Sequence, residues 1–154
     1  MDNIYLLRHC LATLAFRTQH ALRGAPESYP EFKAGKNVWT PLRILNHMTE
    51  IVVSTNEIYC GRDASKFELL PWEEVVDKFH DALHELDNNL FEADPPGANR
   101  ILQLVQGPWL DLFTHVGQLM TLRRLAGSPV DTEPYYRSDI RIGRVGKDQP
   151  LTTA

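Results

Sequence analysis

The chain has 154 residues, of which 43% are hydrophobic and 23% are charged, a composition typical of a soluble globular protein with one domain. Its formal net charge of -4 argues against a nucleic-acid partner, because a nucleic-acid-binding surface needs clustered basic side chains. No apolar run reaches the roughly 18 residues of a membrane span, and Asp2, Arg8 and His9 interrupt what would otherwise resemble a signal peptide. We therefore expect a cytoplasmic protein with Cys10 and Cys60 as reduced core residues.

Two long helices are predicted in the N-terminal half. The first covers about residues 2–23, where apolar side chains recur at intervals of three and four residues. The second begins after Thr40, a favourable N-cap residue, with Pro41 at the first helical position, and it ends at Gly61. The connection between them, residues 24–39, is long enough to run the length of a helix. A crossover is therefore allowed, and these two helices need not be antiparallel neighbours.

Two further helices are predicted in the C-terminal half. The third begins at Trp72 with two glutamates in its first turn, where carboxylates suit the helix dipole. It ends in the ADPPG segment at residues 93–97. A short segment, NRILQLVQ, leads to the fourth helix, which is bounded by Gly-Pro at its start and by Gly at its end, residues 107–127.

Nothing in the sequence predicts a β-strand, since the β-branched residues 51–53 lie inside a longer helical pattern. Four amphipathic segments of about 20 residues predict an all-α four-helix bundle. We expect a single domain over residues 1–154, with an irregular C-terminal tail from about residue 130.

The fourth helix carries two polar side chains, Asp111 and His115, on the flank of its apolar face. Residues four apart on a helix point in the same direction, and Gln118 continues their row. His47 interrupts the apolar face of the second helix in a similar way. Two imidazoles and one carboxylate are enough to bind a divalent transition metal with open coordination positions, and bundle interiors hold such sites. The alternatives are a plain ion pair between Asp111 and His115, and a core histidine bonded to a carbonyl group.

A second pair, His80 and His84, is also spaced by four residues, in the third helix. Both lie outside the apolar seam of that helix and among acidic residues, so we expect a solvated surface there rather than a site. The segment at residues 135–147 is rich in arginine and tyrosine. We expect a solvated tail or, as the functional alternative, an anion clamp at the mouth of a pocket. In the clamp, Arg137, Arg141 and Arg144 supply charge, and Tyr135 and Tyr136 form a wall.

The segments TPLRILNHM and LDLFTHVGQLMTLRRLAGSPV resemble the DinB/YfiT-like superfamily, and the resemblance covers most of the chain. The most specific part is a pattern formed by His115, Gly117, Gln118, Leu119, Leu122, Arg123, Arg124 and Gly127. The resemblance implies a four-helix bundle, often homodimeric, in which one histidine of the second helix and two of the last helix bind a metal. The matching residues are His47, Asp111 and His115, so Asp111 stands where the superfamily has a histidine.

The resemblance also implies a metal-dependent enzyme that acts on a small molecule: a transferase, isomerase or hydrolase-like enzyme that uses a low-molecular-weight thiol. The ion would be zinc, nickel, iron or manganese, with Gln118 as a supporting group beside the ligands. The alternative is a non-catalytic dimeric bundle that binds a small ligand, or a structural bundle with a vestigial metal site. A homodimer is further indicated by apolar residues outside the predicted core stripes, such as Leu6, Tyr59 and Leu110. We expect no nucleic-acid or membrane partner.

Overall fold

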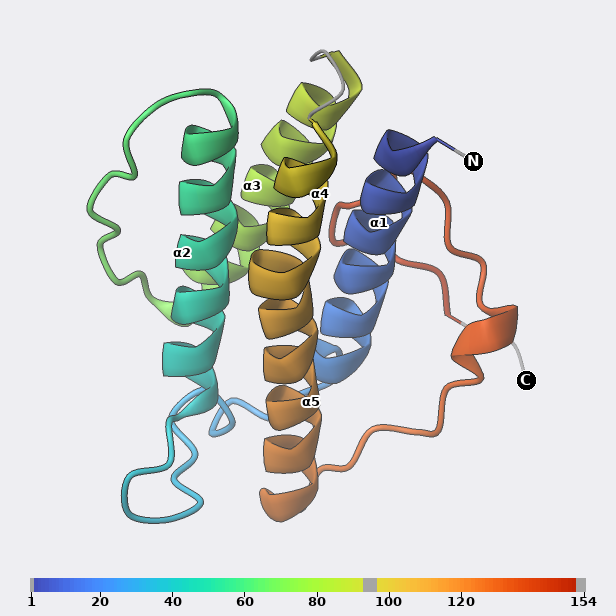
Figure 1. Cartoon of the computed structure of the whole chain (residues 1–154). Coiled ribbons are helices and arrows are strands. Elements are labelled where there is room, and N and C mark those ends of the chain that lie inside the picture. The colour runs from blue at the N-terminus through green and yellow to red at the C-terminus, as the bar shows by residue number, and fades with distance from the viewer. Residues whose placement is uncertain (1, 93–96, 152–154) are drawn as a thin grey trace.

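A computed structural model describes residues 2–92 and 97–151 and shows a bundle of helices (Figure 1). Its helices are α1 (Asn3–Leu22), α2 (Pro41–Tyr59), α3 (Trp72–Glu92), α4 (Ala98–Leu104) and α5 (Leu110–Leu125). A π-helical turn, η1 (Val105–Trp109), joins α4 to α5, and a 3-10 turn, η2 (Tyr135–Arg137), lies in the C-terminal tail. The described residues contain no strand, so the predicted all-α fold is confirmed.

The helices form a ring in which α1 and α2 occupy opposite corners. Helix α1 packs against α3 and α5, and α2 packs against the same two helices. The connection at residues 23–40 stays at one end of the bundle, whereas residues 60–71 return along its length, so that α2 and α3 point the same way (Figure 1). The long return segment therefore lies between the second and third helices, and the face shared by α2 and α5 stays uncrossed by it.

The predicted helix starts are present because their capping residues act as expected. The Asp2 carboxylate accepts a hydrogen bond from the Ile4 backbone N–H (3.1 Å), and the Thr40 hydroxyl accepts one from the Arg43 N–H (3.3 Å). Pro41 occupies the first position of α2, where its missing N–H costs no helical hydrogen bond. The predicted terminator of α3 lies largely outside the described residues, and α3 itself ends at Glu92.

The predicted start of the last helix is wrong, because the helical path begins at Ala98 and continues through Gly107 and Pro108. Proline inside an α-helix removes one hydrogen bond and crowds the preceding turn. The chain accommodates it with a π turn, in which the Leu110 N–H bonds the Val105 carbonyl five residues back. Such a turn adds one residue to the helix and changes the direction in which every later side chain points. It therefore contributes to setting which face α5 turns toward α2.

Arg123, part of the motif that carries the family resemblance, has a structural place at the end of the bundle. Its side chain is buried and donates to the carbonyls of Ala21 (2.8 Å), within α1, and Arg23 (3.0 Å), just beyond its end. It also donates to the Ser128 carbonyl (2.7 Å), after α5. A cation at a helix C-terminus is favoured by the helix dipole. Arg123 therefore ties the end of α1 to the end of α5.

The C-terminal tail is not simply solvated, because it packs against α1 and α3. Val145 is fully buried, and its carbonyl lies 2.7 Å from Nδ1 of His80. The Gln19 amide nitrogen lies 2.8 Å from Nε2 of the same ring, and Lys147 pairs with Asp77 of α3. The expectation that His80 is solvated is wrong: the tail covers it and leaves it 3% exposed.

His84 is exposed, as predicted. Both cysteines are free thiols, and Cys10 is half-buried against the core, where burial raises its pKa. Cys60 is exposed, which corrects the expectation of a core position, because α2 ends one residue before it. Among the described residues, no helix combines the length and the apolar character that crossing a membrane would require.

Candidate metal site

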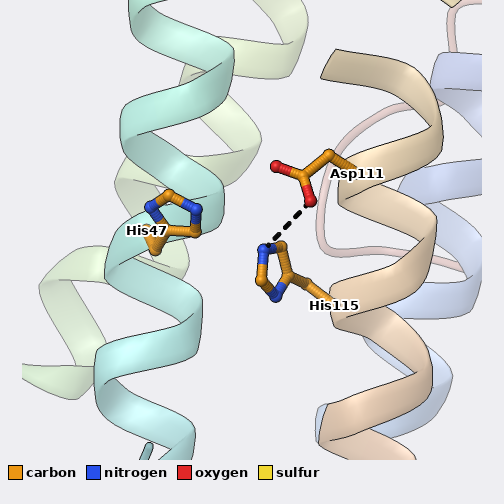
Figure 2. Close-up of side chains that lie close together, drawn as sticks. All are labelled: His47, Asp111 and His115. Atoms are coloured by element: carbon orange, nitrogen blue, oxygen red, sulfur yellow. Dashed lines mark ion pairs between the residues drawn. The ribbon is translucent and has the colours of Figure 1, made fainter. Parts of the chain in front are cut away.

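His47 of α2 and the pair Asp111 and His115 of α5 face one another across the contact between these two helices (Figure 2). Each residue offers one ligand atom, and these three atoms all lie within 4.8 Å of one another. The two imidazole rings meet nearly at right angles, with centroids 4.9 Å apart. The structure therefore brings together the three residues that the sequence selects as metal ligands.

The local geometry follows from helix spacing. Asp111 and His115 are one turn apart on α5, and Nε2 of His115 lies 3.4 Å from Oδ1 of Asp111. The His115 side chain is 10% exposed, that of His47 is 33% exposed and that of Asp111 is 50% exposed. The group thus lies at the edge of the core, where one ligand is fixed by packing and solvent reaches the other two.

Gln118 determines how the His115 ring presents its nitrogens. The Gln118 side-chain carbonyl oxygen lies 2.9 Å from Nδ1 of His115, and a carbonyl oxygen only accepts. Nδ1 therefore carries a hydrogen, and in the neutral ring Nε2 presents a lone pair toward Asp111. Metal-binding histidines are typically oriented in this way by an acceptor on the other nitrogen.

This orientation directs Nε2 of His115 toward a carboxylate oxygen of Asp111 at 3.4 Å. Either a direct ion pair or a bound cation can join the two atoms at this distance. Two ligands about 2.1 Å from an ion at a tetrahedral angle lie about 3.4 Å apart, so this spacing fits a divalent metal. His47 needs only a small side-chain movement to join them, given the 4.8 Å limit on the group.

Trp39 and Glu50 are neighbours of the site that the sequence did not indicate. The Trp39 ring packs edge-on against His47, with centroids 5.3 Å apart, and lies nearly parallel to His115 at 6.4 Å. Arg43 covers the Trp39 ring at 4.3 Å. A Glu50 oxygen lies 3.8 Å from Nδ1 of His47, and its spacing of three residues on α2 is a signal that could have found it.

A cleft of about 910 Å³ opens beside the site, between the connection that precedes α2 and the last three turns of α5. His115 lines this cleft, whereas His47 and Asp111 do not. The three-residue group therefore lies at the edge of the cleft, with His115 common to both. Gln118, the partner of His115, also lines the cleft.

Tyr136 and Arg141 are not brought to this group. The tail that carries them runs beside α1, on the side of the bundle away from α2 (Figure 1). Tyr136 is fully exposed, and Arg141 donates to Asp139 of the tail itself (2.8 Å). The tail lies there because Val145 and His80 anchor it between α1 and α3. The pocket role expected for Tyr136 and Arg141 finds no support in this placement.

Comparisons with known protein families, with curated proteins and with solved structures found no match to this chain. The resemblance to the DinB/YfiT-like superfamily therefore remains a prediction from the sequence.

Proposed function

We propose that His47, Asp111 and His115 bind a divalent transition metal, and that the protein is a metal-dependent enzyme acting on a small molecule held in the adjacent cleft. The observation that carries this proposal is the convergence of three ligand atoms within 4.8 Å, from two helices, at the edge of a cleft of about 910 Å³. Three protein ligands leave at least one coordination position open, as catalytic metal sites require.

The ligand set suits zinc, nickel, iron or manganese, since two imidazoles and a carboxylate are common to sites for all four. When bound, such an ion supplies a Lewis acid that lowers the pKa of a water or a thiol. Asp111 partly neutralises the ion, and the Gln118 oxygen holds His115 with Nε2 directed toward the group. Trp39 packs against both histidine rings and gives the site an apolar wall.

The resemblance to the DinB/YfiT-like superfamily supports a more specific proposal. The reaction would be a transfer, isomerisation or hydrolysis that uses a low-molecular-weight thiol, in a homodimeric protein. Leu6 and Leu110, apolar residues outside the predicted core, are exposed and available for such a dimer contact, whereas Tyr59 is partly buried against the core.

A second candidate is a non-catalytic bundle in which His115 and Asp111 form an ion pair. It is favoured by their direct approach at 3.4 Å and by the presence of aspartate where the superfamily has a histidine. In this case the cleft binds a small ligand without metal, or the group is the remnant of a metal site.

Metal binding to purified protein separates the two candidates. The protein is purified without a nickel column, treated with chelator, and titrated with zinc, nickel, iron(II) or manganese by calorimetry. We expect one equivalent of metal per chain in the wild type and a loss of at least about a hundredfold in affinity in His47→Ala. His84→Ala, which removes an exposed histidine of α3, is the matched control and binds as the wild type does. Absence of binding, or equal binding by His47→Ala, contradicts the proposal.

A further inference from the structure

The cleft beside His115 has a lining whose chemistry defines the ligand that it can hold. We infer that it takes a small molecule with an uncharged, apolar body, whose head group is directed toward His47, Asp111 and His115. The position of the head group rests on the proposed function, because it depends on the metal site. The apolar character of the body depends on the lining of the cleft alone.

The walls of the cleft are apolar and in part uncovered. Val38, Trp39 and Ile44 form the side before and at the start of α2, and Leu122 and Leu125 form the side on α5. Val38, Trp39 and Leu125 are exposed large hydrophobic residues, with Leu125 61% exposed. These apolar walls are exposed to water, so an apolar ligand that covers them binds favourably.

No aspartate, glutamate, lysine or arginine is among the described residues that line the cleft. The hydroxyl hydrogens of its two threonines are already used, since Thr114 donates to the Leu110 carbonyl (2.9 Å) and Thr121 to the Gly117 carbonyl (3.0 Å). The Gln118 oxygen is occupied by His115. A charged ligand body would therefore lose water without gaining a charged partner, which disfavours it.

Gly117 lines the cleft at a point where the surrounding space is empty. It lies within α5 and does not have a positive φ, so the backbone does not require glycine there. A Cβ added to it would meet no atom within 4 Å. The space above Gly117 is therefore open, and a large side chain at this position would extend into the cleft. The cleft volume of about 910 Å³ is within the range of small-molecule sites.

Two thiols with the same head group and different bodies test the inference on zinc-loaded protein. 2-Phenylethanethiol carries an uncharged apolar body, and 2-mercaptoethanesulfonate carries an anionic one. By calorimetry, we expect the aromatic thiol to bind at least about tenfold more tightly, because its ring covers the apolar walls. Equal or tighter binding of the sulfonate overturns the inference.

Two substitutions locate the effect in the cleft. Gly117→Leu fills it and is expected to weaken the aromatic thiol by at least about tenfold, whereas Gly117→Ala, the matched control, is expected to retain most of the preference. Leu125→Arg places a cation on the exposed rim and is expected to narrow or reverse the preference, and it acts at a position whose exposure makes misfolding no concern. If Gly117→Leu and Leu125→Arg both keep the wild-type preference, the inference is wrong.

A metal-free measurement separates this inference from the proposed function. In chelator-treated wild type, 2-phenylethanol is titrated and the backbone amide resonances of Gly117 and Thr121 are followed by NMR. Saturable shifts that disappear in Gly117→Leu are expected, and their absence overturns the inference even if zinc binds. If the shifts appear but zinc does not bind the wild type, the apolar cleft stands and the metal-dependent function fails.

Discussion

Two pairs of side chains with the same four-residue spacing, His80–His84 on α3 and Asp111–His115 on α5, have different surroundings in this protein. His80 on α3 is buried, and both of its ring nitrogens have partners, the Gln19 amide and the Val145 carbonyl. Asp111 and His115 on α5 lie at the edge of the core beside an open cleft, and the Asp111 side chain is 50% exposed. A buried histidine with both ring nitrogens bonded to the protein stabilises the fold, whereas a partly exposed pair beside a cleft can be reached by a ligand.

The cause of the difference is what covers each helix face. The tail, through Val145 and Lys147, closes over the face of α3 that carries His80. On α5 the neighbouring connection supplies Trp39, which contacts the histidines but leaves a cleft of about 910 Å³. The same i, i+4 arrangement is thus a structural anchor where a distant segment covers it, and a candidate site where the neighbouring segment leaves a cleft.

The largest expected effect comes from replacing the satisfied histidine. His80→Leu removes both hydrogen bonds of the ring. It leaves the Gln19 amide and the Val145 carbonyl buried without a partner, which costs about 2–3 kcal/mol of unfolding free energy. His84→Leu, at the exposed member of the pair, changes it by less than about 0.5 kcal/mol. Urea denaturation of the two variants measures the difference. Equal stabilities would show that the tail does not depend on His80.

A smaller effect is expected at the residue that orients His115. Gln118→Leu removes the acceptor for Nδ1 and is expected to weaken zinc binding by about tenfold or more. Because Gln118 is exposed, the stability of the metal-free protein should hardly change. Thr114→Val, another exposed α5 position on the cleft, is the control and should bind zinc as the wild type does. Calorimetric zinc titrations of both variants decide whether Gln118 supports the site.

Stability is expected to depend on pH through the buried His80. Burial lowers the pKa of His80 and nearby Lys147 lowers it further, while the Val145 carbonyl opposes the shift. Below its ordinary value of about 6.5, the unfolded chain binds a proton that the native state resists, so stability falls as pH falls, by at most about 1.4 kcal/mol per pH unit. Urea denaturation of metal-free protein between pH 7.5 and 5 measures the slope. The slope of unfolding free energy against pH should be the same in His84→Gln as in the wild type and smaller in His80→Gln. An unchanged slope in His80→Gln would show that His80 is not its source.

Much of this arrangement could be predicted from local sequence. The starts of α1 and α2 followed from Asp2, Thr40 and Pro41, whose effects reach only one turn. His47, Asp111 and His115 were found because their helices are long enough for the apolar pattern to fix which side chains share a face.

The missed features depend on distant or competing interactions. Gly107 and Pro108 are a normal helix-start signal, and only the preceding residues from Ala98 show that the helix has already begun. The burial of His80 depends on Val145, 65 residues later in the chain. The position of Trp39 depends on the path of a connection that has no periodic pattern. Such contacts cannot be inferred from spacing along one helix.

The central claim is that His47 acts with Asp111 and His115 as one metal site, and melting temperatures with and without zinc test it most directly. Zinc at a hundredfold excess over Kd stabilises a native state by about 2.7 kcal/mol, which corresponds to roughly 5–10 °C in Tm for a chain of this size. We predict such a rise for the wild type, a rise at least as large for Asp111→His, which supplies a third imidazole, and none for His47→Ala. If His47→Ala responds to zinc as strongly as the other two, or if the wild type and Asp111→His do not respond, the claim is wrong.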